Sequence, residues 1–237
     1  MLYRSSSSAM GRVFSVLAAL IVCAGIADCA PYSSGARDGT LSPSLGLRSA
    51  ARATLGEILS GAPGTYIDRL LVDRDSTIER WPARIGDPLH IWIDSSAIVT
   101  GAQAGFPAAV RAAFTEWGTT GIPLRFVYVP SEEHADVRVH WTDHLDHKTG
   151  STTWRTDRNG WLMVTDITLA THVSDGHVLD ARGMRAIALH EVGHALGLSH
   201  SGDPQDVMAP LVRVDGLSLP DRSTIKLLYT LPAGHIR

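Results

Sequence analysis

Apolar and polar side chains alternate after Pro88, and the period of that alternation changes along the chain. Leu89, Ile91 and Ile93 fall on one face of a run with period two, which predicts a strand. Between 107 and 119 the apolar residues instead recur three or four positions apart, which predicts a helix opened by its proline. Period-two patterns then return and predict strands at 124–129, 135–141 and 161–170, with a short one near 152–155.

Two more helices are predicted near the C-terminal end. Asp180 is a suitable N-cap for a helix that runs to about Leu196, because its carboxylate can accept hydrogen bonds from the first turn. The string S-L-P-D at 218–221 resembles a capping box and predicts a final helix to Tyr229. Strands followed by helices in this order predict one α+β domain over 80–237.

The first 27 residues have the pattern of a secretory signal peptide. Arg4 and Arg12 precede an apolar run over 13–25 that is shorter than the roughly 20 residues needed to span a bilayer. Small residues before position 28 favour cleavage after Ala27, with an uncleaved signal anchor as the alternative. We therefore expect a secreted or cell-envelope protein, extracellular or periplasmic, with no stable membrane span after signal removal. Residues 28–79 are predicted to be a spacer or pro-segment.

Both cysteines, Cys23 and Cys29, lie in this N-terminal part. Cleavage after Ala27 leaves one cysteine, so the mature chain has no internal disulfide. The string I-A-D-C resembles a bacterial lipoprotein acylation site, but Asp28 stands where a small residue is expected. A lipid anchor at Cys29 is therefore the less favoured alternative.

Composition excludes several classes of protein. The 237 residues carry 21 basic and 24 acidic side chains, so the net charge is −3, and a nucleic-acid binder usually has a basic excess. Hydrophobic residues at 44% and charged residues at 19% are ordinary for a soluble globular protein. Nothing in the sequence indicates an oligomer, and a monomer is the default expectation.

The chemistry is concentrated in H-E-V-G-H-A-L-G-L-S-H at 190–200. His190 and His194 lie one helical turn apart, so both imidazoles project from one face and can bind one zinc ion. Gly197 can end the helix in a left-handed conformation, which lets His200 complete a three-histidine site with an open fourth position. Glu191 lies between the ligands and is the expected general base for a zinc-activated water that attacks a carbonyl.

This string resembles the signature of the metzincin zinc peptidases, and Ser201 after the third histidine resembles the matrixin branch. Met208 stands eight residues after His200, where that family has its Met-turn. The resemblance implies a zincin-like fold, with a twisted, mostly parallel sheet, long helices and zinc in the cleft. It also implies a zinc endopeptidase with a protein or peptide substrate, which would lie extended along the strand near 152–155. The specificity-pocket wall would come from three residues after the Met-turn, Pro210, Leu211 and Val212.

The chain departs from the family in how latency could be kept. Matrix metalloproteinases carry a P-R-C-G-type cysteine switch, and residues 28–80 contain no such string. A carboxylate from Asp68, Asp73 or Asp75 is an alternative inhibitory ligand.

A second, structural zinc is not expected. Calcium is common in the family and stays possible here. Suitable side chains occur without the family's spacing at Asp143, His144, Asp146, His147 and His172. No residues are assigned to calcium. Two other functions remain open: a non-catalytic secreted binding protein that contains zinc, and a hydrolase of non-peptide amides. The presence of Glu191 argues against the first, because a purely structural metal needs no base.

Overall fold

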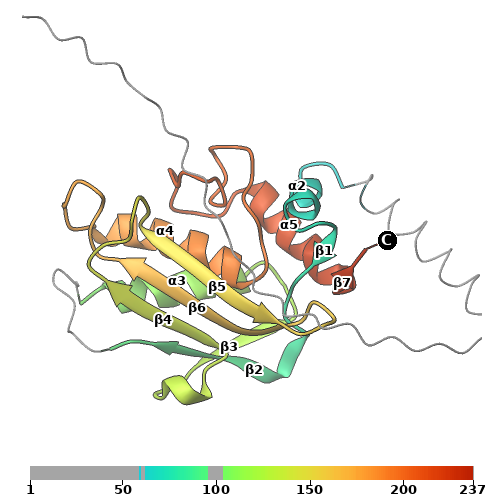
Figure 1. The fold of residues 1–237 in the computed structure, drawn as a ribbon, viewed down its shortest axis with the longest axis horizontal. Coiled ribbons are helices and arrows are strands. Elements are labelled where there is room, and N and C mark those ends of the chain that lie inside the picture. The colour runs from blue at the N-terminus through green and yellow to red at the C-terminus, as the bar shows by residue number, and fades with distance from the viewer. Residues whose placement is uncertain (1–58, 60–61, 96–103, 237) are drawn as a thin grey trace, which may run out of the picture.

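The computed structural model describes residues 59, 62–95 and 104–236, and a mixed sheet lies at its centre (Figure 1). Five strands pair in the order β3-β2-β4-β6-β5. Their bounds are β2 Arg84–Ile93, β3 Leu124–Tyr128, β4 Val137–Thr142, β5 Gly150–Thr156 and β6 Leu162–Ala170. All neighbours are parallel except β5, which runs antiparallel to β6 at the edge. This arrangement confirms the predicted α+β class with a mostly parallel sheet.

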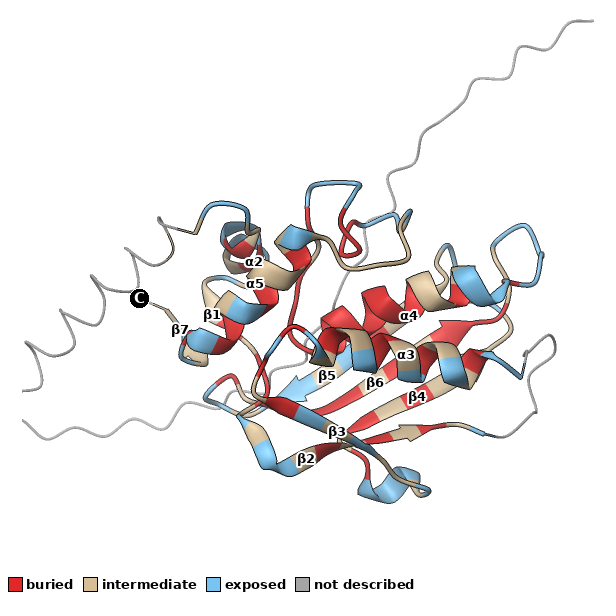
Figure 2. Cartoon of the chain, turned by 180° about the vertical axis from the view of Figure 1, so that it is seen from behind, coloured by how far each residue is buried: buried red, intermediate tan, exposed pale blue. Residues whose placement is uncertain are grey.

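Two long helices cover the same face of this sheet, as both views show (Figures 1 and 2). Helix α3 (Phe106–Gly118) buries its apolar stripe there, and α4 (Ala181–Ala195) is buried along most of its C-terminal half. The indole of Trp117 donates a hydrogen bond to the Leu189 carbonyl over 2.9 Å, which ties α3 to α4. The helix that carries the histidine motif therefore packs against both the sheet and a second helix.

The predicted helix starts are confirmed by their caps. The Asp180 carboxylate accepts from the Gly183 amide at 2.6 Å and begins α4. Ser218 and Asp221 form a reciprocal capping box at the start of α5 (Leu219–Thr230). Strand β2 begins five residues before the predicted strand. The sequence did not indicate this part, because its residues are mostly exposed and carry no alternating apolar pattern.

The described residues from Ile67 to Ile78 pack against the rest of the domain. Helix α2 (Ile67–Asp73) lies beside α5, and β1 (Thr77–Ile78) pairs antiparallel with β7 (Gly234–His235) (Figure 1). Ile67, Leu70 and Ile78 are at most 1% exposed, so they belong to the same core as the sheet. A short 3-10 helix, η1 (Glu132–His134), precedes β4. Where the domain starts in the mature protein stays a prediction.

The predicted signal peptide over 1–27 and the possible lipid anchor at Cys29 lie outside the described residues. Within those that are described, no helix combines the length and apolar character that crossing a membrane requires.

Candidate metal centre and active site

Helix α4 positions the first two histidines of the motif. His190 and His194 are 4% and 6% exposed and project from the same side of the helix. The helix ends at Ala195, and Gly197 then adopts φ +105°, as predicted for the residue that turns the chain. A side chain at Gly197 would also overlap the Glu79 carbonyl oxygen. Glycine is therefore required twice over at the turn that leads to His200.

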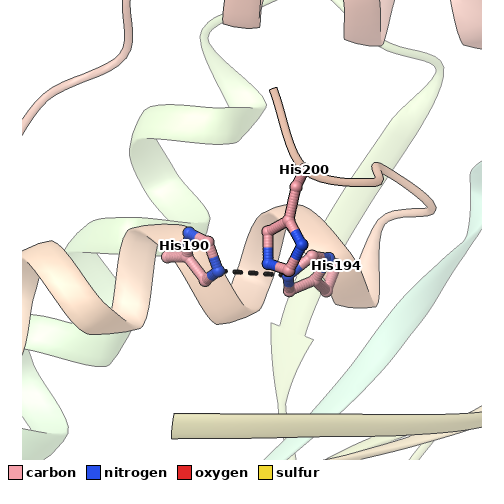
Figure 3. A group of neighbouring side chains, drawn as sticks. All are labelled: His190, His194 and His200. Atoms are coloured by element: carbon pink, nitrogen blue, oxygen red, sulfur yellow. Dashed lines mark hydrogen bonds between the residues drawn. The ribbon is translucent and has the colours of Figure 1, made fainter. Parts of the chain in front are cut away.

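The three imidazoles converge on one point (Figure 3). The Nε2 atom of His194 lies 3.1 Å from that of His190 and 3.2 Å from that of His200. Two nitrogens bound to one tetrahedral zinc at about 2.0–2.1 Å lie about 3.3 Å apart, so this spacing fits zinc closely. Among the described residues, no other group of three or more His, Cys, Asp or Glu residues brings its ligand atoms together in this way.

Two backbone carbonyls orient the helix-borne imidazoles. His190 Nδ1 lies 2.7 Å from the Val207 oxygen, and His194 Nδ1 lies 2.8 Å from the Leu198 oxygen. A carbonyl can only accept, so each Nδ1 carries the proton and donates it. Each Nε2 therefore keeps its lone pair for a metal.

Burial keeps these imidazoles neutral. It lowers the pKa of His190 to about 4, lowers that of His194 well below the ordinary value, and lowers that of His200 as well. Neutral imidazole is the form that binds zinc, so the site is ready for the metal at neutral pH.

Glu191 lies on the sheet side of the same helix and is 5% exposed. Burial raises its pKa to about 7, while the Thr152 hydroxyl and the charge of Lys148 act in the opposite direction. Thr152 Oγ1 donates to Glu191 Oε2 over 2.6 Å. A side chain at Gly150 would overlap Oε1 of the same carboxylate. Strand β5 therefore both holds Glu191 and makes room for it.

The sequence predicted neither the hydrogen bond from Thr152 to Glu191 nor the close approach of Gly150 to it. The only signal was the predicted short strand near 152–155, which does not indicate that its buried face meets α4.

Met208, the residue predicted to form a Met-turn, lies against helix α4 at Gly193. It is fully buried, and a side chain at Gly193, between the two helix-borne histidines, would overlap its sulfur. The Met208 carbonyl accepts from the Ser201 amide at 2.8 Å, which links the turn to the residue after His200. Met208 is thus an apolar support for the helix backbone.

The matrixin family model matches residues 93–230, which is more than half of the chain. The chain belongs to the matrixin family. Over 61 residues it is 43% identical to human matrix metalloproteinase-15, covering 24% of this chain and 9% of that protein. A 58-residue match to rat matrix metalloproteinase-16 is 41% identical and covers 22% of this chain and 10% of that protein. Metalloendoproteinase 1 of Glycine max is 26% identical over 145 residues, which are 52% of this chain and 45% of that protein. The matched part therefore spans less than half of each of these relatives.

In this matrixin a pocket of about 670 Å³ opens beside His190 and Glu191. The three predicted wall residues, Pro210, Leu211 and Val212, all line it. Other lining residues were not predicted for the pocket: His147, Lys148, Thr149, Gly150, Val173, Ser174, Leu179, Gly183, Ala186 and Ile187. They come from the loop before β5 and the first residue of that strand, from the loop after β6 and from the side of α4, so no single stretch of sequence marks the pocket.

The residues considered for a second zinc do not form a comparable cluster. His144 and His172 stack with their ring centroids 4.9 Å apart, and Thr171 Oγ1 lies 2.8 Å from His172 Nδ1. That no second zinc is bound stays a prediction, and calcium binding is not tested by this arrangement.

Proposed function

We propose that this matrixin is an exported zinc-dependent endopeptidase. His190, His194 and His200 would hold the ion, and Glu191 would act as general base. The observation that carries the proposal is the convergence of three imidazole Nε2 atoms beside the buried carboxylate of Glu191. Burial also raises the pKa of that carboxylate to about 7. A group that must accept and return a proton at neutral pH works best with a pKa near that pH.

Zinc, when bound, supplies Lewis-acid chemistry, acidifying water and polarising the scissile carbonyl. Glu191 takes the proton of the attacking water and later delivers it to the leaving amine. Thr152 occupies Oε2 of the carboxylate, so Oε1 is the oxygen left to carry the proton. No covalent link between enzyme and substrate is needed.

The sheet edge and the pocket suggest how a peptide binds. Strand β5 pairs with β6 alone among the described strands, so its other edge can accept an extended peptide by strand addition. The side chain after the scissile bond would then enter the pocket walled by Pro210, Leu211 and Val212. These walls favour an apolar residue at that position.

The test is hydrolysis of an unfolded protein such as casein by the purified chain, with zinc, with a chelator and as the Glu191→Ala variant. We expect cleavage that the chelator abolishes and that Glu191→Ala reduces by about 10²–10⁴-fold, with zinc content unchanged. Glu133→Ala, an exposed glutamate of η1, is the matched control and should retain activity. Wild-type protein that holds one zinc yet cleaves no member of a broad peptide library would instead support the zinc-containing binding protein.

A further inference from the structure

The segment 66–81 lies against the loop that carries the third histidine. The Trp81 indole donates to the Ala195 carbonyl over 2.8 Å, at the end of α4. The Glu79 carbonyl touches Gly197 so closely that no side chain fits there. Arg74 Nη2 donates to the Leu198 carbonyl over 3.2 Å. The end of α4 and two positions of the following loop are therefore contacted by residues that precede the sheet.

Arg74 is the member of this segment whose side chain binds the Leu198 carbonyl. Its side chain is 9% exposed, and its Nη1 pairs with Glu79 Oε2 at 3.3 Å. The guanidinium lies over the Trp154 ring at 5.0 Å, and the Trp154 indole donates to the same Glu79 oxygen over 2.9 Å. Glu79 and Trp154 thus fix the planar guanidinium in one orientation, with one edge directed at Leu198.

The Leu198 carbonyl is the same oxygen that accepts from His194 Nδ1. It therefore receives two N–H groups, one from a zinc-binding imidazole and one from Arg74. Outer hydrogen-bond partners of this kind orient a ligand imidazole and tune its affinity for the metal.

A second hydrogen-bonded path runs from the same segment to His190. The Tyr66 hydroxyl donates to Asp221 Oδ1 over 2.9 Å. Asp221 is fully buried, and its Oδ2 accepts from the Val207 amide at 2.9 Å. Val207 in turn supplies the carbonyl that orients His190. Two paths thus connect residues 66–79 with the two helix-borne imidazoles.

We propose that residues 66–79 are a permanent part of the active protein, and that Arg74 is a positioning residue that fixes the His194 imidazole through the Leu198 carbonyl. Any maturation cleavage then falls before Tyr66, so a removed pro-segment is shorter than the predicted 28–79. This inference rests on the proposed zinc site but not on peptide hydrolysis.

The test compares zinc affinity of the full chain as wild type, Arg74→Met and Arg74→Lys, by competition with a chromophoric chelator. Arg125→Met is the matched control, because Arg125 also donates to a backbone carbonyl, that of Ile85, but on β3 at the opposite edge of the sheet. We expect Arg74→Met to weaken zinc binding about tenfold, the lower end of the range for outer partners of a metal ligand. Arg74→Lys should recover part of that loss, and Arg125→Met should bind as wild type.

The visible spectrum of the cobalt-substituted proteins separates positioning from general destabilisation. It should change in Arg74→Met, because the ligand field depends on imidazole orientation, and stay unchanged in Arg125→Met at equal helical content. Equal zinc affinity and equal spectra for both variants would overturn the inference. A wild type that binds no zinc would instead overturn the proposed function.

A second substitution applies if Arg74→Met does not fold. Tyr66→Phe removes only the hydroxyl that binds Asp221 and should weaken zinc binding about threefold, since it acts through one more intermediate. Tyr128→Phe is its control, with an exposed hydroxyl that contacts the Arg111 carbonyl. Unchanged zinc affinity in Tyr66→Phe would overturn the claim that residues 66–79 hold the site.

Discussion

The two halves of the zinc site are built differently. His190, Glu191 and His194 come from one helix, whose 3.6-residue period alone places them near one another. His200 comes from a loop whose path depends on Gly197, on the Leu198 carbonyl and on residues more than a hundred positions earlier in the chain. The spacing of the helix residues is thus encoded locally, whereas the path of the loop to His200 depends on tertiary contacts. Substitutions in the two halves should therefore differ in how they affect zinc affinity and stability.

The largest effect is expected from the ligands themselves. His194→Ala should weaken zinc binding on the order of a thousandfold or more, because about a third of a structural zinc's binding free energy is lost. His200→Ala should weaken zinc binding less, on the order of a hundredfold, since His200 is only half-buried and water can take its place as a ligand. Metal content after dialysis against a graded chelator series measures both.

His134→Ala, an exposed histidine of η1, is the control for these two variants and should bind zinc normally. Zinc retained in His194→Ala would mean that the ligand assignment is wrong. Equal losses for the two ligand variants would mean that the loop half is as rigid as the helix half.

Gly197→Ala tests the loop half by itself. The methyl group must adopt φ +105° and also overlaps the Glu79 carbonyl. We expect a loss of about 3 kcal/mol in the free energy of unfolding, measured by urea denaturation.

Gly121→Ala is the matched comparison for this substitution. Gly121 has φ +83° with open space around its Cβ position, so only the backbone strain applies, about 1 kcal/mol. Equal losses for the two variants would show that Glu79 does not brace the loop.

The same division explains what the sequence could predict. The H-E-x-x-H spacing, the glycine and the third histidine lie within 11 residues, so local periodicity was enough to identify them. The caps at Asp180 and Ser218 were also recognisable, because capping depends on residues three positions apart.

Contacts between distant segments left no such trace. Residues 67–79 were predicted as part of a spacer or pro-segment, because their apolar content is moderate. The structure buries Ile67, Leu70 and Ile78 in the same core as strands and helices far along the chain. Thr152 reads as an ordinary strand residue, and only the packing of β5 against α4 brings its hydroxyl to Glu191. Both contacts join residues far apart in the chain, so no local pattern in a single sequence indicates them.

Thr152→Val gives the smallest expected effect and tests whether the helix-borne base depends on the strand. The Thr152 hydrogen bond lowers the pKa of Glu191 against the larger, opposing effect of burial, which leaves it at about 7. The ionised carboxylate is the active form, so activity should rise with pH through this range. Without the hydroxyl the acid limb of kcat/KM should move to higher pH by about one unit, because a hydrogen bond to a charged group contributes about 1.5–3 kcal/mol and one unit corresponds to about 1.4 kcal/mol.

At pH 6 this shift amounts to about a tenfold lower kcat/KM, whereas near pH 9 the variant should approach the wild type. Thr153→Val is the control, because Thr153 lies on the exposed face of the same strand and should leave the profile unchanged. An acid limb at the same pH in Thr152→Val and wild type would mean that Glu191 is positioned by α4 alone. In that case the tertiary contacts would orient the histidines but not the Glu191 carboxylate.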